Sequence, residues 1–147
     1  MSANKKGIDN VDILLVEDNP ADARLTQEAF KETNVRSTLH VVRDGAEAME
    51  FLRRNGRFAN APRPDMILLD LNLPKKDGRQ VLAEIKNSPE FKSIPIVILT
   101  TSNAAEDIQH TYNHHANCYI TKPADLDQFM DVVKQIELFW LSIVQLP

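Results

Sequence analysis

Apolar residues recur along this chain in two alternating patterns, short continuous runs and longer stretches of helical period. Five runs rich in leucine or β-branched residues predict strands, at 11–16, 37–43, 65–71, 94–100 and 117–121. Five stretches with apolar residues three or four positions apart predict helices, at 20–33, 45–55, 78–87, 104–115 and 124–143. Strands and helices therefore alternate along the chain.

The strand pattern also predicts the kind of sheet. Residues 11–16, 67–69 and 96–99 are nearly continuous in apolar side chains, which is typical of strands covered by helices on both faces. Alternating strands and helices with short links form a parallel sheet between two helix layers. We therefore expect an α/β fold, a doubly wound five-stranded parallel sheet with five flanking helices in three layers.

Polar residues follow four of the five predicted strands, at the point where each strand ends. They are Glu17 and Asp18 after the first strand, Asp70 after the third, Thr100 after the fourth and Lys122 after the fifth. Because ligands of such folds bind at the carboxyl ends of the strands, we expect these side chains to gather at one edge of the sheet.

Three carboxylates at one edge repel one another unless a cation balances their charge. Mg²⁺ suits such a set, because it binds one or two carboxylates and leaves positions open for phosphate oxygens. Beside it, Asp70 can attack a phosphoryl group and form an acyl phosphate. Lys122 and Thr100 can stabilise the charge on the transferred oxygens. The position of Asp70 at a strand end thus predicts a phosphoacceptor.

Each of these residues has a structural interpretation when taken alone. Asp18 is a candidate helix cap, although Asn19 followed by Pro20 is the better one, with Asp22 in the first turn. Asp70 alone is a candidate turn residue, and a threonine or a lysine is ordinary at a strand end. Their occurrence together, at the ends of the first, third, fourth and fifth strands, favours the functional interpretation.

Composition and charge narrow the class of protein. The 147 residues fit one domain, with a core at about 11–140, a polar N-terminal tail at 1–10 and a C-terminal extension at 141–147. The net charge of −4 without a basic stripe argues against nucleic-acid binding. No apolar run is long enough to span a membrane, and the polar N-terminus is unlike a signal peptide. We expect a cytoplasmic protein that binds no nucleic acid and no membrane.

Four stretches, "ILLVEDNPAD", "DMILLDLNLPKKDG", "IPIVILTTS" and "CYITKP", resemble the receiver domain of bacterial two-component response regulators. The resemblance implies the strand order 2-1-3-4-5 of that family. It also implies that Asp70 accepts a phosphoryl group from a histidine kinase. Glu17, Asp18 and Asp70, with the backbone carbonyl of Asn72, match the family's Mg²⁺ ligands.

The resemblance assigns further roles near the phosphoacceptor. Thr100 matches the switch hydroxyl that binds the phosphoryl group, and Lys122 matches the lysine that pairs with it. Tyr119 stands where the family has an aromatic switch, although a half-buried strand tyrosine is its structural alternative.

Other positions are expected to tune the chemistry. Asn72 and Ser102, two places beyond the acceptor and the switch residue, tune dephosphorylation in the family. Thr101 departs from the small residue, usually alanine, that the family has there, and could narrow access to the acyl phosphate. The departure at Thr101 does not change the predicted fold or the predicted phosphoacceptor.

Two stretches, "RPDMILLDLNLPKKDGRQVLAEIK" and "IELFWLSIVQLP", look most like the small response regulators paired with cyanobacterial phytochromes. That likeness implies a phytochrome-type histidine kinase as the phosphoryl donor. Because the chain ends soon after the last predicted helix, we expect it to signal through protein–protein contacts rather than through an effector domain.

Two other functions are compatible with this fold. One is a Mg²⁺-dependent phosphohydrolase with an aspartate nucleophile, but such an enzyme usually needs an acid two residues beyond the nucleophile, where this chain has Asn72. The other is a flavin-binding module, but Glu17 and Asp18 would repel the flavin phosphate. We therefore expect a phosphoacceptor signalling protein and not an enzyme with an external substrate.

The last predicted helix is apolar on more than one face. One stripe of apolar residues along it, which includes Val133 and Ile136, predicts contact with the core. Other apolar residues predict a homodimer interface together with the fourth helix and the fifth strand, although the tail could instead fold back over its own domain. The predicted interface residues are Phe129, Met130, Leu138, Phe139, Trp140 and Leu141.

Overall fold

The structure is a computed structural model, and it describes residues 11–32, 36–101, 107–109, 118–122 and 126–143. Within them, five parallel strands form one sheet in the order β2-β1-β3-β4-β5. The strands are β1 Val11–Val16, β2 Ser37–Val42, β3 Met66–Leu69, β4 Ile96–Thr100 and β5 Cys118–Thr121. The predicted fold class and strand order are confirmed.

Helices connect the strands as the periodicity predicted. The helices are α1 Pro20–Lys31, α2 Gly45–Arg53, α3 Gly78–Lys86 and α5 Leu126–Ile143, with a short 3₁₀ helix η1 at Gly56–Phe58 that the pattern did not predict. Their ends, and those of the strands, lie within two residues of the predicted ones. Of the helix predicted at 104–115, residues 107–109 are helical and the rest lies outside the described residues.

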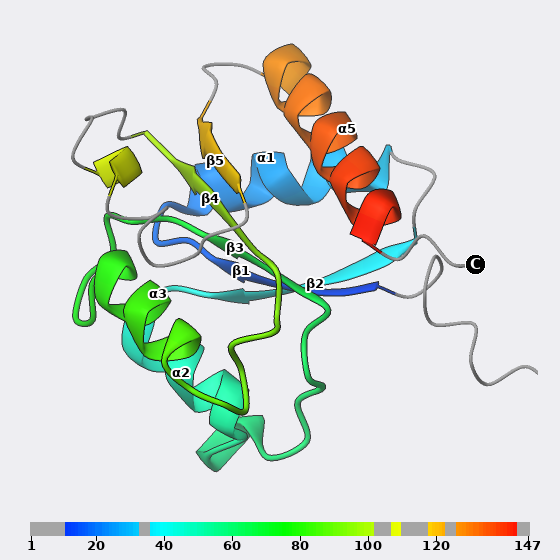
Figure 1. The fold of residues 1–147 in the computed structure, drawn as a ribbon. Coiled ribbons are helices and arrows are strands. Elements are labelled where there is room, and N and C mark those ends of the chain that lie inside the picture. Colours follow the sequence, from blue (N-terminus) through cyan, green and yellow to red (C-terminus); the bar gives the residue numbers. More distant parts are fainter. Residues whose placement is uncertain (1–10, 33–35, 102–106, 110–117, 123–125, 144–147) are drawn as a thin grey trace, which may run out of the picture.

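The helices form two layers, one on each face of the sheet (Figure 1). The helices α1 and α5 pack side by side on one face, and α2 and α3 cover the other. Successive residues of a strand point to opposite faces, so one strand feeds both cores. In β1, Ile13 and Leu15 face α1 and α5, whereas Leu14 and Val16 face α2 and α3. This double burial explains the continuous apolar runs.

Local sequence signals fix where the helices begin. The Asn19 side chain caps α1 by accepting hydrogen bonds from the backbone N–H groups of Ala21 and Asp22, at 2.9 and 3.1 Å. Pro20 occupies the first helical position, where its missing N–H is not needed. Asp77 caps α3, and the Gln80 side chain bonds back to its backbone N–H. The cap predicted at Asn19 is confirmed.

The helix α5 has a buried stripe and an exposed one. Val133 and Ile136 are each 1% exposed, which confirms their predicted contact with the core. Met130 is half-buried and packs against the same core, so its own domain already covers part of this predicted interface residue. Leu138 is 67% exposed. The side chains of the other predicted interface residues lie outside the described part: Phe129, Phe139, Trp140 and Leu141.

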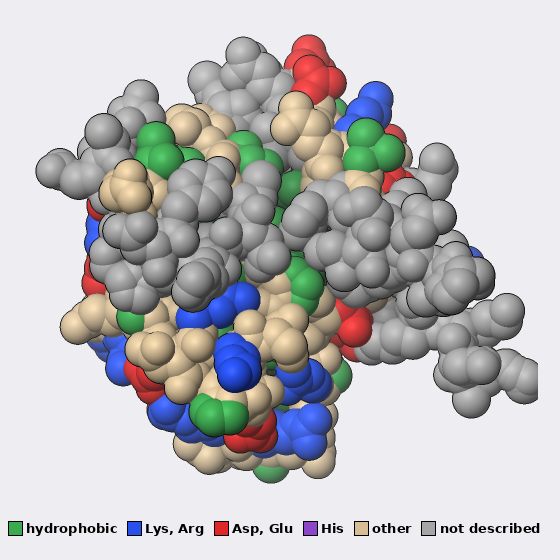
Figure 2. Space-filling view, in the orientation of Figure 1, with side chains coloured by type: hydrophobic (Ala, Val, Ile, Leu, Met, Phe, Trp, Pro, Cys, Tyr) green, Lys and Arg blue, Asp and Glu red, His purple; other side chains and the backbone are tan. Residues whose placement is uncertain are grey.

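Charged side chains of both signs cover the surface over α2 and α3, where Lys and Arg lie beside Asp and Glu (Figure 2). Glu84 pairs with both Arg53 and Lys76, and Arg57 pairs with Glu47. In the part of the chain that the structure describes, no helix is long and apolar enough to cross a membrane.

Candidate functional site

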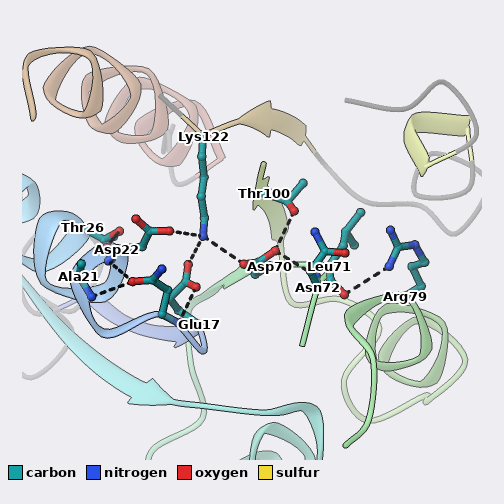
Figure 3. A network of polar contacts seen from close by, with 11 residues as sticks. Glu17, Ala21, Asp22, Thr26, Asp70, Leu71, Asn72, Arg79, Thr100 and Lys122 are labelled. Atoms are coloured by element: carbon teal, nitrogen blue, oxygen red, sulfur yellow. Dashed lines mark hydrogen bonds and ion pairs between the residues drawn. The ribbon is translucent and has the colours of Figure 1, made fainter. Parts of the chain in front are cut away.

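The carboxyl ends of four strands bring polar side chains from distant parts of the sequence to one place (Figure 3). Glu17 follows β1, Asp70 follows β3, Thr100 ends β4 and Lys122 follows β5. All four side chains are buried or nearly so. The predicted gathering of these residues at one sheet edge is therefore confirmed, whereas the role of each one stays a prediction.

Asp70 lies at the centre of the site and is only 7% exposed. Its Oδ1 accepts hydrogen bonds from the Thr100 hydroxyl at 2.7 Å and from the backbone N–H of Asn72 at 3.1 Å. Its Oδ2 accepts one from the Lys122 ammonium at 3.0 Å. A hydroxyl, an amide and an ammonium therefore all donate hydrogen bonds to this carboxylate.

Lys122 is the cation of the site. Its ammonium lies 2.5 Å from Glu17 Oε1, 2.9 Å from Asp22 Oδ2 and 3.0 Å from Asp70 Oδ2, and its side chain is 5% exposed. Burial alone would lower the pKa of Lys122, but the hydrogen bonds to Glu17 and Asp22 raise it overall. Three acidic side chains share this one ammonium, so acids outnumber the base at the site.

Glu17 is held at the start of the loop that follows β1. Its backbone N–H donates to the carbonyl of Val42, which extends the sheet by one residue. Its Oε2 accepts a hydrogen bond from the backbone N–H of Asn19 at 3.0 Å. Burial raises the pKa of Glu17 despite the hydrogen bond from Lys122. A further cation beside Glu17 would favour the charged form that burial disfavours.

The loop after Asp70 is packed against the backbone of Asp70 itself. The Leu71 carbonyl accepts a hydrogen bond from the Gly78 N–H at 3.0 Å. A Cβ atom at Gly78 would lie 2.2 Å from the Asp70 carbonyl oxygen, which is far inside van der Waals contact. Position 78 therefore requires glycine because the first turn of α3 passes directly over the end of β3.

The other predicted site residues that the structure describes differ from these four buried residues in exposure. Asp18 is exposed, unlike its neighbour Glu17. Thr101 is exposed as well, and Ser102 lies outside the described residues. Tyr119 is half-buried and packs against the core shared with α2 and α3.

Among the described residues, no group of three or more His, Cys, Asp or Glu side chains is set to hold a metal ion. The Lys122 ammonium contacts both buried acids, Glu17 and Asp70, whereas Asp18 is exposed. The donors nevertheless suit a hard dication, because they are carboxylate oxygens with surplus negative charge.

Two functional contacts were missed by the sequence reasoning. Asp22, interpreted as a residue of the first helical turn, reaches Lys122. The available signal was that Asn19 already caps α1, which leaves the Asp22 carboxylate free for another partner. Arg79, at the start of α3, forms a two-pronged ion pair with Asp107 at 2.6 and 2.7 Å. No spacing rule connects residues so far apart in the sequence.

The fold and this strand-end site together define a class of protein, and comparison with known proteins agrees. The sequence profile described as the response regulator receiver domain matches residues 13–134. The chain therefore belongs to the response regulator receiver-domain family, and it is a signalling protein.

Within this family, the chain is similar to particular response regulators. The chain is 53% identical over 135 residues to "Response regulator Rcp1" of Synechocystis sp., a match that covers 92% of each chain. The crystal structure of the phosphorylated cyanobacterial phytochrome response regulator RcpA is 59% identical, with a TM-score of 0.86, over 91% of this chain and 96% of that one. The Mn²⁺-bound form of Rcp1 is 52% identical, with a TM-score of 0.85, over 93% and 99%. The predicted likeness to cyanobacterial phytochrome regulators is confirmed.

Proposed function

We propose that this chain accepts a phosphoryl group on Asp70 from the phosphohistidine of a histidine kinase, in a reaction that requires Mg²⁺, and then signals through protein contacts. The observation that carries the proposal is the surrounding of Asp70. Its buried carboxylate meets the Thr100 hydroxyl and the Lys122 ammonium within 3.0 Å. Both donors can turn from the carboxylate to a phosphoryl group attached to it.

The transfer balances without any further reagent. A carboxylate oxygen of Asp70 forms a bond to phosphorus while the bond from phosphorus to the donor nitrogen breaks, and the leaving imidazole takes a proton. The transferred group carries negative charge on its three outer oxygens. Lys122 supplies a positive charge and Thr100 a neutral hydrogen bond for those oxygens, and the packed loop at Gly78 keeps the strand end in place.

Glu17, Asp18, Asp70 and the backbone carbonyl of Asn72 are the groups that would hold Mg²⁺. Glu17 and Asp70 are buried acids with a shared surplus of negative charge, which supports a cation site. The bound ion would supply charge neutralisation for the incoming phosphoryl oxygens. A Mn²⁺-bound structure of a relative 52% identical to this chain also supports a divalent ion here.

We also propose a phosphoryl donor and a location. Because one of the most similar structures is of a cyanobacterial phytochrome response regulator, we infer a phytochrome-type kinase as the donor, and we propose that the chain acts in the cytoplasm. For the output we propose a homodimer through the fourth helix, β5 and α5. Support comes from Leu138 on α5, since a leucine that is 67% exposed gains from burial against a second subunit.

The acceptor can be tested by intact-protein mass spectrometry after incubation with phosphoramidate and Mg²⁺. The wild-type chain is expected to gain one phosphoryl group, whereas Asp70→Asn gains none. A matched control is Asp127→Asn, which removes an exposed acid from α5 and should be phosphorylated like the wild type. Omission of Mg²⁺ should abolish the adduct. An adduct that persists in Asp70→Asn would refute the assignment of the acceptor.

A further inference from the structure

Lys122 bonds to three acids, of which two are proposed cation ligands and one is not. Glu17 and Asp70 are the proposed ligands, and Asp22 comes from the first turn of α1. This third contact joins residues 100 positions apart in the sequence. The proposed phosphoryl transfer assigns no role to this contact between Asp22 and Lys122.

A cation at Glu17 and Asp70 competes with Lys122 for particular oxygen atoms. One oxygen of Glu17 is held by a backbone N–H, that of Asn19, and the other, Oε1, by the Lys122 ammonium. Backbone N–H groups are fixed by the fold, whereas a lysine side chain can move. The exchangeable partner of Glu17 is therefore the lysine.

The two oxygens of Asp70 also differ in their partners, since one faces the movable lysine and the other does not. Its Oδ1 accepts from the Thr100 hydroxyl and from the backbone N–H of Asn72, and its Oδ2 accepts from Lys122. When a cation takes the oxygens that face Lys122, the ammonium loses two of its three carboxylate partners. An ammonium at a site that is 5% exposed is costly without a partner, so it must keep an anion or turn toward water.

The Asp22 carboxylate is placed to remain the anionic partner of Lys122 when a cation binds. Its backbone is fixed in α1, because its N–H donates to the Asn19 side chain and its carbonyl accepts from the Thr26 hydroxyl at 2.8 Å. Its side chain is 26% exposed, between the interior and the solvent, and it is not needed as a helix cap. The carboxylate is therefore anchored near Lys122 and independent of the oxygens that a cation would take.

We infer that Asp22 is a positioning residue that keeps the Lys122 ammonium inside the site when a divalent cation binds Glu17 and Asp70. This inference rests on the proposed function, because it concerns the lysine that serves the phosphoryl group. Asp22 acts on Asp70 only through Lys122. Its substitution should therefore change the placement of the ammonium and the rate of phosphoryl uptake at saturating Mg²⁺.

The placement of the ammonium can be followed by ¹H–¹⁵N NMR of lysine Nζ groups, with Mg²⁺ as the only ligand. The Lys122 signal is assigned by its absence in Lys122→Arg, which keeps the charge. In the wild type the signal should persist at saturating Mg²⁺, because a paired ammonium exchanges its protons slowly. In Asp22→Asn it should be lost when Mg²⁺ is added. A control is Glu28→Gln, which removes the same charge from an exposed position on α1.

Kinetics of phosphoramidate labelling provide the second measurement. At saturating Mg²⁺, Asp22→Asn should lower the rate about tenfold, the size of one charge-assisted hydrogen bond. In a Lys122→Met background the same substitution should change the rate less than twofold, whereas Glu28→Gln should leave it unchanged in both backgrounds. Such non-additivity is expected only when Asp22 acts through the lysine.

The outcomes separate this inference from the proposed function. A Lys122 signal that stays equally protected in Asp22→Asn with Mg²⁺ bound overturns the inference, and so does an equal loss of rate in both backgrounds. If the wild-type chain takes up no phosphoryl group, the proposed function fails, and the NMR arm with Mg²⁺ alone still decides the role of Asp22. If Lys122→Met does not fold, the NMR arm again decides it.

Discussion

Replacement of Lys122 by methionine tests whether one ammonium holds the site together. In the wild type this ammonium bonds Glu17 and Asp70, which are 3% and 7% exposed, and Asp22 at the rim. Methionine has a similar length but no charge, so the substitution leaves two buried acids without their cation. Loss of one partner of a buried ion pair is strongly destabilising, because the other partner stays buried and unpaired.

The size of the loss has an upper bound for each acid that takes up a proton, because a buried acid can be protonated instead of staying charged. One such proton also removes the repulsion between Glu17 and Asp70. For a carboxyl with an ordinary pKa of 4.5, protonation at pH 7 costs about 3.4 kcal/mol, at about 1.4 kcal/mol per pH unit. Lys122→Met should therefore lower the free energy of unfolding by about 3 kcal/mol at pH 7. With one such acid, the difference from the wild type should shrink by about 1.4 kcal/mol for each unit that the pH falls toward 5.

The sign of this pH dependence follows from the direction of the pKa. Burial already raises the pKa of Glu17, and without Lys122 its folded pKa rises further above the unfolded value, so the folded state of the variant binds the proton more tightly. The variant consequently gains stability relative to the wild type as the pH falls from its folded pKa toward its unfolded pKa.

The assay is urea unfolding followed by circular dichroism at pH 7, 6 and 5, in a chelator. A matched control is Lys31→Met, since Lys31 has a side chain that is 69% exposed and should change the unfolding free energy by less than about 0.5 kcal/mol. The reasoning is refuted if Lys122→Met and the wild type differ by less than about 1 kcal/mol at pH 7, or if their difference does not shrink at lower pH.

Three further predictions concern the loop, the surface and the output face. Gly78→Ala should lower the free energy of unfolding by about 2–3 kcal/mol, because the alanine Cβ would lie 2.2 Å from the Asp70 carbonyl oxygen. The same substitution should slow phosphoryl uptake. Chemical unfolding and labelling that both stay unchanged would contradict this prediction. Glu84→Gln should lower the unfolding free energy by about 0.5–1 kcal/mol at pH 7, because the hydrogen bond from Lys76 lowers the pKa of Glu84. That stability is present above pH 4.5 and is lost as the pH falls through the folded pKa, so urea unfolding of wild type and variant should converge in acid. Leu138→Glu should weaken self-association about tenfold in sedimentation at micromolar concentration, and a wild type that stays monomeric with and without phosphorylation would contradict the proposed dimer.

Much of the architecture could be predicted because its causes are local or periodic. A strand covered on both faces must be apolar at every position, so runs such as 67–69 predicted the buried centre of a parallel sheet. The cap at Asn19 and Pro20 depends only on neighbouring residues, and it is where the sequence placed it. The short helix η1 was missed because a single turn has no apolar period to detect.

The candidate site was predictable to the extent that it follows from strand ends. In a parallel α/β sheet every strand ends at the same edge, so the order of the chain already places Glu17, Asp70, Thr100 and Lys122 together. Which atoms meet there was not predictable. The contact of Asp22 with Lys122 depends on how α1 turns over the sheet, and that rotation is set by the packing of Ala29 and Phe30 in the core.

The adjacent acids Glu17 and Asp18 show most clearly which properties the sequence determines and which depend on the tertiary structure. The sequence by itself determined that two carboxylates follow the first strand, because a chemical pattern and a strand boundary are both local properties. Only the tertiary structure decided that Glu17 is buried against Lys122 while Asp18 is exposed. The physical reason is that burial depends on contacts between distant parts of the chain: the Glu17 N–H bonds to Val42 in the sheet, and the Glu17 carboxylate meets Lys122.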